Sequence, residues 1–203
     1  MRPIALAFIV ATAASAVGFG SCDHGSSSAP PTTSSHREET TLADLRQRPL
    51  HIAQLRAEYP CPNSRPRTIS PDFGPGLGDG PVYHIGFSNG VLRFSYPPPK
   101  DSLFARSQWG GQKVLWVSDP AYDGPILIRG RQMDGPNQLR FGEGSAAILQ
   151  ELAFGAHGAG NLTDLWRNFP SYTRLRSPGC YAYQVDGDGF SDTVVFRAAV
   201  WGS

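Results

Sequence analysis

The sequence predicts an all-β protein: an antiparallel, immunoglobulin-like β-sandwich preceded by a signal sequence, a disordered tether and an extended arm. Three observations support this fold class. About eight short runs rich in apolar and aromatic residues recur at intervals of roughly 10–20 residues. Turn-forming Gly, Pro, Asn and Asp separate these runs, and no regular alternation of strands with helices appears. A small barrel is the alternative arrangement of the same strands.

Residues 1–21 have the pattern of a signal peptide of the lipoprotein type. Arg2 supplies a positive charge, an almost unbroken apolar run covers residues 4–17, and small residues precede Cys22. The sequence Gly-Ser-Cys at this point resembles the lipobox of bacterial lipoproteins, in which the cysteine is diacylated after cleavage, although Phe19 departs from the usual aliphatic residue. Lipid on Cys22 would attach the protein to a membrane without crossing it. The alternative is an ordinary secretory peptide, with Cys22 incidental.

Residues 22–41 are dominated by Ser, Thr and Pro, which predicts a disordered tether. Thr41 is placed to cap a short helical turn, and Pro49 prevents a longer helix. We therefore expect residues 42–62 to form an arm that lies across the domain. The β-sandwich domain is expected to span residues 63–203.

Several strands follow in order within this domain. Residues 63–81 are rich in Gly and Pro and are expected to be a loop. The expected strands are 82–87, 91–96, 113–117, 125–131 and 139–141, and the first two are expected to form a hairpin around Asn89-Gly90. Residues 146–154 are compatible with a strand or a helix, and their neighbours favour a strand.

The clearest element is the C-terminal stretch 177–198, SPGCYAYQVDGDGFSDTVVFRA, which predicts a β-hairpin around an Asp-Gly turn. With the turn centred on Gly187-Asp188, Val185 would face Phe190 and Tyr181 would face Val194. One face would then supply half of a core. The large apolar residues of that face are Tyr181, Val185, Phe190, Val194 and Phe196.

Cys61 and Cys180 are the pair that remains if Cys22 carries lipid. An exported protein meets an oxidising compartment, so a disulfide is expected, with two buried free thiols as the alternative. The bond would close a loop of about 120 residues, worth ~4–5 kcal/mol in the chain-entropy treatment.

Composition excludes some partners. The formal net charge is +1 and charged residues make up 17% of the chain, without clusters of Lys or Arg. Binding to nucleic-acid backbones therefore has no electrostatic basis, and a basic face for membrane surfaces is missing. The expected membrane partner is reached through the lipid anchor, and no cofactor is expected.

Candidate chemistry is sparse. Asp186, Asp188 and Asp192 lie close in sequence, but they lack the closing Glu of an EF-hand and are flanked by strands, so they are only weak metal candidates and no metal site is assigned. A Ser145–His84 pairing has no motif to support it, and His84 is expected to pack at a sheet surface.

Two aromatic residues are candidate ligand contacts. Trp109 stands in a Ser-Gln-Trp-Gly-Gly loop, and Tyr122 in a turn between two strands. Exposed aromatics on loops of a rigid sandwich are reasonable contacts for a sugar or a peptide. The alternative for Trp109 is packing against the arm.

Four segments together resemble a family of small exported proteins of high-GC bacteria, many with lipoprotein signals and with no assigned activity. They are 48–52 (RPLHI), 61–66 (CPNSRP), 123–142 and 169–198, of which PGCYAYQVDG at 178–187 is the most specific. The resemblance implies an immunoglobulin-like sandwich with Cys61 and Cys180 paired, and it implies no catalytic residues. Ala53 stands where proline would be expected after RPLHI.

The sequence thus predicts a lipid-anchored protein on the outer face of the cytoplasmic membrane or the cell surface, or a secreted one. Its sandwich would bind or scaffold an envelope protein or glycan without catalysis. The alternative is a secreted hydrolase acting on an envelope or extracellular substrate, and a third hypothesis is a purely structural module.

Overall fold

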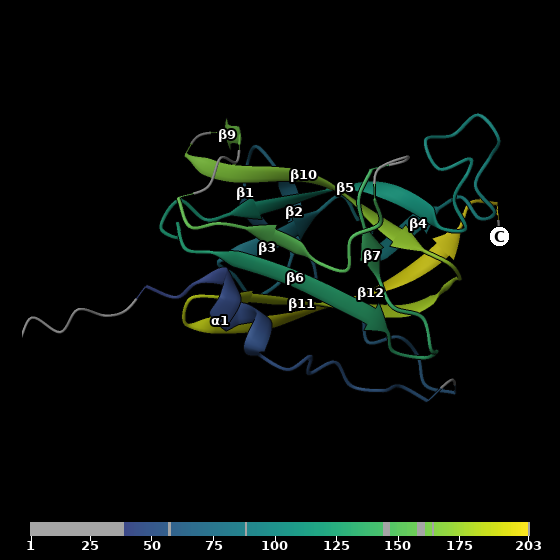
Figure 1. Ribbon diagram of the computed structural model, residues 1–203, viewed down its shortest axis with the longest axis horizontal. Helices are drawn as coiled ribbons and strands as arrows, with labels where there is room; N and C mark the ends of the chain where they lie inside the picture. Colours follow the sequence, from purple (N-terminus) through teal and green to yellow (C-terminus); the bar gives the residue numbers. More distant parts are fainter. Residues whose placement is uncertain are drawn as a thin grey trace, which may run out of the picture. The chain divides into compact units, whose positions relative to one another are not determined.

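Two β-sheets packed face to face form the domain in the computed structural model, which describes residues 39–56, 58–87, 89–143, 147–157, 161–163 and 165–202 (Figure 1). The first sheet has the order β1 (Arg67–Ser70), β2 (Gly74–Leu77), β3 (Val82–Ile85), β5 (Gly110–Ser118), β10 (Trp166–Leu175) and β7 (Arg140–Phe141), and β9 (Asn161–Thr163) also pairs with β10. The second has the order β4 (Val91–Phe94), β12 (Phe190–Val200), β11 (Gly179–Gly187), β6 (Ile126–Gln132) and β8 (Leu152–Phe154).

This arrangement confirms the predicted all-β sandwich. The described residues form twelve strands rather than about eight, because some short edge strands lie in segments rich in Gly and Pro that were predicted to be loops. Residues 63–81, expected to be a loop, contain β1 and β2, which pair antiparallel with a register shift between Thr68 and Ser70. In 146–154 the structure has a strand, β8, over Leu152–Phe154.

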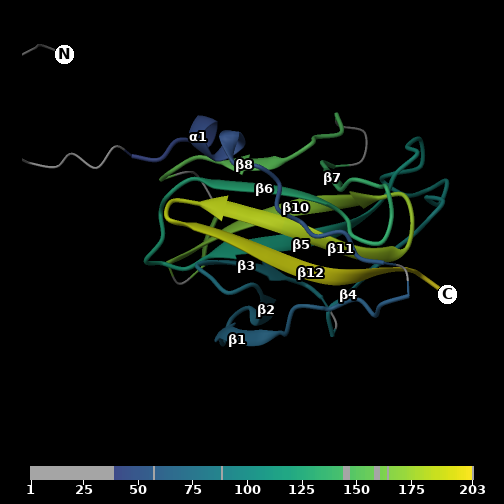
Figure 2. The same ribbon diagram turned by 90° about the horizontal axis from the view of Figure 1, so that it is seen from below.

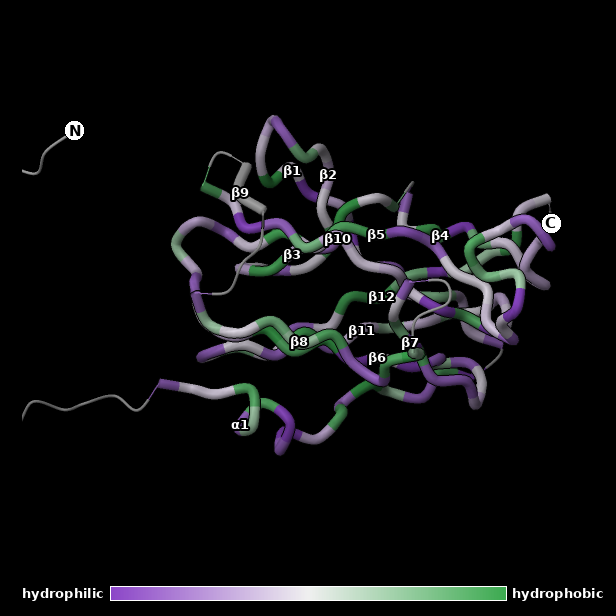
Figure 3. Tube along the Cα trace, turned by 45° about the horizontal axis from the view of Figure 1, so that its top comes forward, coloured by the Kyte–Doolittle hydropathy of each residue, from purple (hydrophilic) through white to green (hydrophobic). Residues whose placement is uncertain are grey.

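The core lies between the sheets and combines aliphatic side chains with large aromatic ones. Alternation along the strands sends every second side chain inward, and Figure 3 shows hydrophobic residues concentrated on the strands and hydrophilic ones on the connecting loops. The largest side chains buried here include Phe94, Trp116, Phe141, Tyr181, Tyr183 and Phe196.

The C-terminal hairpin has the predicted inward face but a different register. Gly187 pairs with Phe190, so the turn is Asp188-Gly189, with Gly189 at φ +77° in the left-handed region. Val185 therefore faces Asp192, and Tyr181 faces Phe196. A shift of two residues keeps each side chain on its face, and the predicted set of core residues survives the error.

The hairpin expected at Asn89-Gly90 is wrong. Both residues have positive φ, 55° and 73°, as a tight turn requires. The strands on either side nevertheless lie in different sheets: β3 pairs with β5, and β4 pairs in parallel with β12. The turn passes the chain from one layer to the other.

The arm lies across the domain, on the outer face of the second sheet. Thr41 and Asp44 form a reciprocal capping box at the start of α1 (Leu42–Gln47), whose Leu45 is fully buried. After α1 the chain runs extended across β11 and β12 (Figure 2). Ile52 and Cys61 pack there in a second small apolar cluster with residues of the sheet.

Candidate binding surface

Strand pairing defines two ends of the sandwich. The hairpin end holds the β11–β12 turn at Asp188 and the end of β5 at Ser118. The disulfide end holds the starts of β5 and β11 and the ends of β10 and β12. At about 3.3 Å per residue, strands of this length separate the two ends by ~30 Å.

The disulfide lies on the outer face of the second sheet. Cys61 of the arm and Cys180 of β11 are bonded, with their Cα atoms 5.4 Å apart, across a sequence separation of 119 residues. This observation agrees with the disulfide expected from the sequence. A groove of about 760 Å³ opens beside the bond, between the arm and the strands β4, β11 and β12.

Two arginines line this groove because of the parallel β4–β12 pairing. Val91 lies opposite Arg197, and Arg93 lies opposite Ala199. Leu92 and Phe94 of β4 point into the core, so Arg93 points outward, as Arg197 does from β12. Within the described residues neither guanidinium forms an ion pair, and Arg93 instead lies 5.8 Å from the ring centroid of Trp201.

The groove also has an acidic group and an aromatic rim. Asp134 accepts hydrogen bonds from the Cys180 backbone N–H at 2.9 Å and from Gln132 Nε2 at 2.9 Å, so its carboxylate already has donors. Tyr59, which lines the groove, and Trp201 beside Arg93 are 56% and 60% exposed. The site therefore combines two guanidinium groups with aromatic surface.

Trp109 lies at the same end of the sandwich, half-buried just before β5. The guanidinium carbon of Arg176 is 4.2 Å from its ring centroid, and that of Arg140 is 5.9 Å away. The loop before it is held by the buried Arg174, which donates to the carbonyls of Gly110 and Trp109 and to Ser107 Oγ. Burial lowers the pKa of Arg174.

Tyr122 lies at the hairpin end and has a structural role. Its hydroxyl donates to the Pro125 carbonyl at 2.6 Å and accepts from the Asp188 N–H at 2.9 Å, which ties two turns together. Its ring meets Phe190 edge to face at 5.3 Å, and burial raises the pKa of the phenol. Because Tyr122 and Trp109 lie at opposite ends, they cannot line one site.

The three aspartates of the hairpin do not converge. Asp192 pairs with core-facing Val185, whereas Asp186 points to the outer face, where the arm covers it. Asp192 accepts from the Asp79 N–H at 2.8 Å, and Asp188 accepts from Thr40 Oγ1 at 2.7 Å. No cluster of three metal-ligating side chains occurs in the part of the chain that the structure describes.

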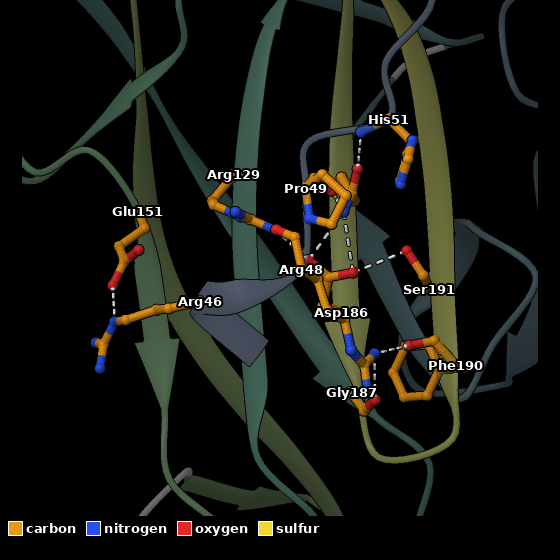
Figure 4. A network of polar contacts seen from close by, with 11 residues as sticks. Arg46, Arg48, Pro49, His51, Arg129, Glu151, Asp186, Gly187, Phe190 and Ser191 are labelled. Atoms are coloured by element: carbon orange, nitrogen blue, oxygen red, sulfur yellow. Dashed lines mark hydrogen bonds and ion pairs between the residues drawn. The ribbon is translucent and has the colours of Figure 1, made fainter. Parts of the chain in front are cut away.

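Asp186 instead belongs to a polar network that holds the arm (Figure 4). Its carboxylate accepts from Arg129 Nη2 at 2.8 Å and from Ser191 Oγ at 2.8 Å, and is fully buried. Arg129 Nη2 also donates to the Arg48 carbonyl, and Arg48 Nη1 donates to the carbonyls of Gly187 and Phe190. Nothing in the sequence indicated this network, because the contacts of Arg48 and Arg129 join residues 57 to 142 positions apart.

The described histidines do not form a catalytic dyad with a serine. His84 is buried between the sheets rather than at a sheet surface, stacked on Phe87 at 3.9 Å. His157 is exposed, with its ring nitrogens 2.9 Å from Asp123 Oδ2 and 3.3 Å from Glu39 Oε1. Ser145 and the lipidation candidate Cys22 lie outside the described residues.

Comparison with known proteins adds little. No family model matches the chain, and no curated protein matches it significantly. A solved X-ray structure of a "Putative Lipoprotein from Bacillus anthracis" shares 14% identity over 70% of this chain and 88% of that chain, with a TM-score of 0.42. A structural similarity this distant does not support any conclusion about function. Among the described residues, no helix is long and apolar enough to cross a membrane.

Proposed function

We propose that this chain is an exported, lipid-anchored protein of the bacterial cell envelope that works by binding an anionic ligand beside its disulfide. The observation that carries the proposal is the groove of about 760 Å³ in which Arg93 and Arg197 project from paired strands without a carboxylate partner among the described residues. A rigid sheet holds both cations in place, and such a cluster attracts an acidic ligand.

The envelope location rests on two features. The Gly-Ser-Cys sequence ending at Cys22 supports lipidation, and the Cys61–Cys180 bond suits an oxidising compartment outside the cytoplasm. Catalysis is not part of the proposal, because none of the described histidines hydrogen-bonds a serine hydroxyl.

Mass spectrometry of the mature protein from its native host tests the location. Cleavage before Cys22 and diacylglycerol on that residue are the expected results. Cys22→Ala is expected to move the protein from the membrane fraction to the medium. A mature chain that begins elsewhere and carries no lipid contradicts the anchor.

A thermal-shift titration tests the groove, with galacturonate and inorganic phosphate as probes. We expect both anions to raise the Tm of the wild type and the Arg93→Gln/Arg197→Gln variant to lose that response. Arg67→Gln is the matched control, because Arg67 is a half-exposed arginine on β1 of the other sheet. An equal response in all three proteins would show that the groove is not the site.

A further inference from the structure

Positive charge is concentrated at the disulfide end, although the net charge of the whole chain is only +1. The basic residues of the strand ends and loops there are Arg93, Lys100, Arg106, Arg140, Arg176 and Arg197, against the acidic residues Asp101, Asp134 and Glu143. The arm adds one residue of each sign, Arg56 and Glu58. The hairpin end has the opposite bias, because the basic residues Arg48, Arg67 and Arg167 are outnumbered there by Glu39, Asp79, Asp119, Asp123, Asp188 and Asp192. The small net charge thus conceals a separation of charge along the strands.

Both tryptophans of the disulfide end are paired with arginine. Arg93 lies over Trp201 at 5.8 Å, and Arg176 lies over Trp109 at 4.2 Å. A guanidinium group stacks through its flat face, so most of its N–H donors, which lie in the plane, stay available at the edges. Each pair therefore offers an apolar indole surface next to a cationic hydrogen-bond donor.

The two pairs are close together. The Trp201 backbone N–H donates to the Phe94 carbonyl at 3.0 Å, and Gly110, the neighbour of Trp109, packs against Phe94 and the Ser95 carbonyl without room for a Cβ atom. Trp109 precedes a strand of the first sheet and Trp201 follows one of the second. Stacked sheets are about 10 Å apart, so the backbones of the two tryptophans are separated by roughly that distance.

We propose that the disulfide end binds an acidic polysaccharide. Trp201, which is 60% exposed, packs under one of its sugar rings, while Arg93 and Arg176 pair with its carboxylate or phosphate groups. Trp109 supports the Arg176 guanidinium stacked on its ring. The inference rests on the proposed binding function and adds the class of ligand. A polymer fits better than a single small anion, because one chain of a few sugars can reach both Arg–Trp pairs and the groove beside them.

An anionic membrane surface is the less favoured partner. The chain reaches the domain at Glu39, which contacts His157 at the hairpin end, and 16 residues lie between Cys22 and Glu39. The chain therefore enters the described domain at the end opposite the Arg–Trp pairs. Since the proposed lipid anchor lies upstream of Glu39, this entry point favours a partner other than the anchoring membrane.

Binding of polygalacturonate, followed by tryptophan fluorescence and calorimetry, tests the proposal. Dextran serves as the uncharged polysaccharide, poly-L-glutamate as an acidic polymer without sugar rings, and phosphatidylglycerol vesicles as the membrane. The wild type is expected to prefer polygalacturonate to each of them. Trp201→Ala and Arg176→Gln are expected to weaken that binding at least fivefold, Trp201→Phe to retain most of it, and Arg67→Gln to leave it unchanged.

Several outcomes overturn the inference. Equal affinity for poly-L-glutamate, with no effect of Trp201→Ala, would reduce the site to a general basic patch. Preference for the vesicles would make it a membrane surface. If polygalacturonate does not bind while galacturonate and phosphate still raise the Tm through Arg93 and Arg197, the proposed anion-binding groove is supported and the polysaccharide proposal is rejected. Unchanged thermal unfolding of each variant confirms that folding is intact.

Discussion

Replacing His84 by phenylalanine should make the protein less sensitive to acid. The His84 side chain is fully buried, stacked on Phe87 and Tyr183 and edge-on to Trp116 at 4.7 Å. Within the described structure neither ring nitrogen has a hydrogen-bond partner, and these ring neighbours are uncharged aromatics. Burial lowers the pKa of His84 from 6.5 to about 3, so the imidazole is neutral in the folded protein.

The sign and size of the effect follow from proton linkage. Below pH 6.5 the unfolded chain takes up a proton at His84 that the folded chain does not, so stability is lost as the pH falls from about 6.5 toward 3. Each pH unit in this window is worth ~1.4 kcal/mol, so the loss between pH 7.5 and pH 4.5 is ~3 kcal/mol. His84→Phe removes this pH-dependent contribution. Any change in stability from packing phenylalanine at this position is the same at both pH values and cancels in the comparison.

Urea unfolding at pH 7.5 and pH 4.5, followed by tryptophan fluorescence, measures the effect. The stability of His84→Phe relative to the wild type should improve by ~3 kcal/mol on acidification. His51→Gln is the control, because the side chain of His51 is exposed. The difference in stability between the His51→Gln variant and the wild type should be similar at the two pH values. If the difference between His84→Phe and the wild type is the same at both pH values, the argument from buried neutral histidine is wrong.

Three further substitutions probe the scaffold by urea unfolding. Cys61→Ser with Cys180→Ser opens a loop of 119 residues and should cost ~4–5 kcal/mol, and reduction of the wild type with dithiothreitol should match it. Asp186→Leu leaves the Arg129 guanidinium without its carboxylate and should cost ~3–5 kcal/mol of stability. Adding Arg129→Met to this variant should recover part of the loss. If the stability losses of the two single variants simply add in the double variant, the pairing is contradicted. Arg174→Met removes the donor to the carbonyls of Trp109 and Gly110 and should cost ~2–4 kcal/mol, with faster proteolysis in residues 97–109; an intact loop would count against it.

Local patterns predicted the layers of the fold better than the partners of its strands. The inward face of the hairpin was correct because alternation of apolar residues survives a two-residue shift in register. Asn89-Gly90 was misleading because its backbone conformation is that of a hairpin turn, while burial of Leu92 and Phe94 beside β12 decides where the next strand goes. Pairing across about 100 residues leaves no signal in a local pattern.

Site residues were harder to predict for the same reason. Trp109 was singled out as an aromatic in a loop, and it lies at the basic end, but its arginine neighbours come from distant strands. Tyr122 looked similar in sequence and is structural, since both sides of its hydroxyl are bonded. Arg93 and Arg197 have no motif at all, because only the parallel pairing of β4 with β12 brings them together. The one available clue was that each arginine stands between apolar residues of a predicted strand, which indicates that its side chain points away from the core.

The crosslink between arm and sheet also determines how this domain responds to tension. A pull on the chain upstream of Glu39 acts first on the arm, where the contacts of Arg48 and Asp186 resist peeling. If those contacts yield, the segment from Glu39 to Cys61 can reach an end-to-end length of ~75 Å before the bond to Cys180 stops further unravelling. Beyond that point the pull reaches the sandwich only through the Cys61–Cys180 bond, so a ligand held beside this bond is kept under tension rather than released.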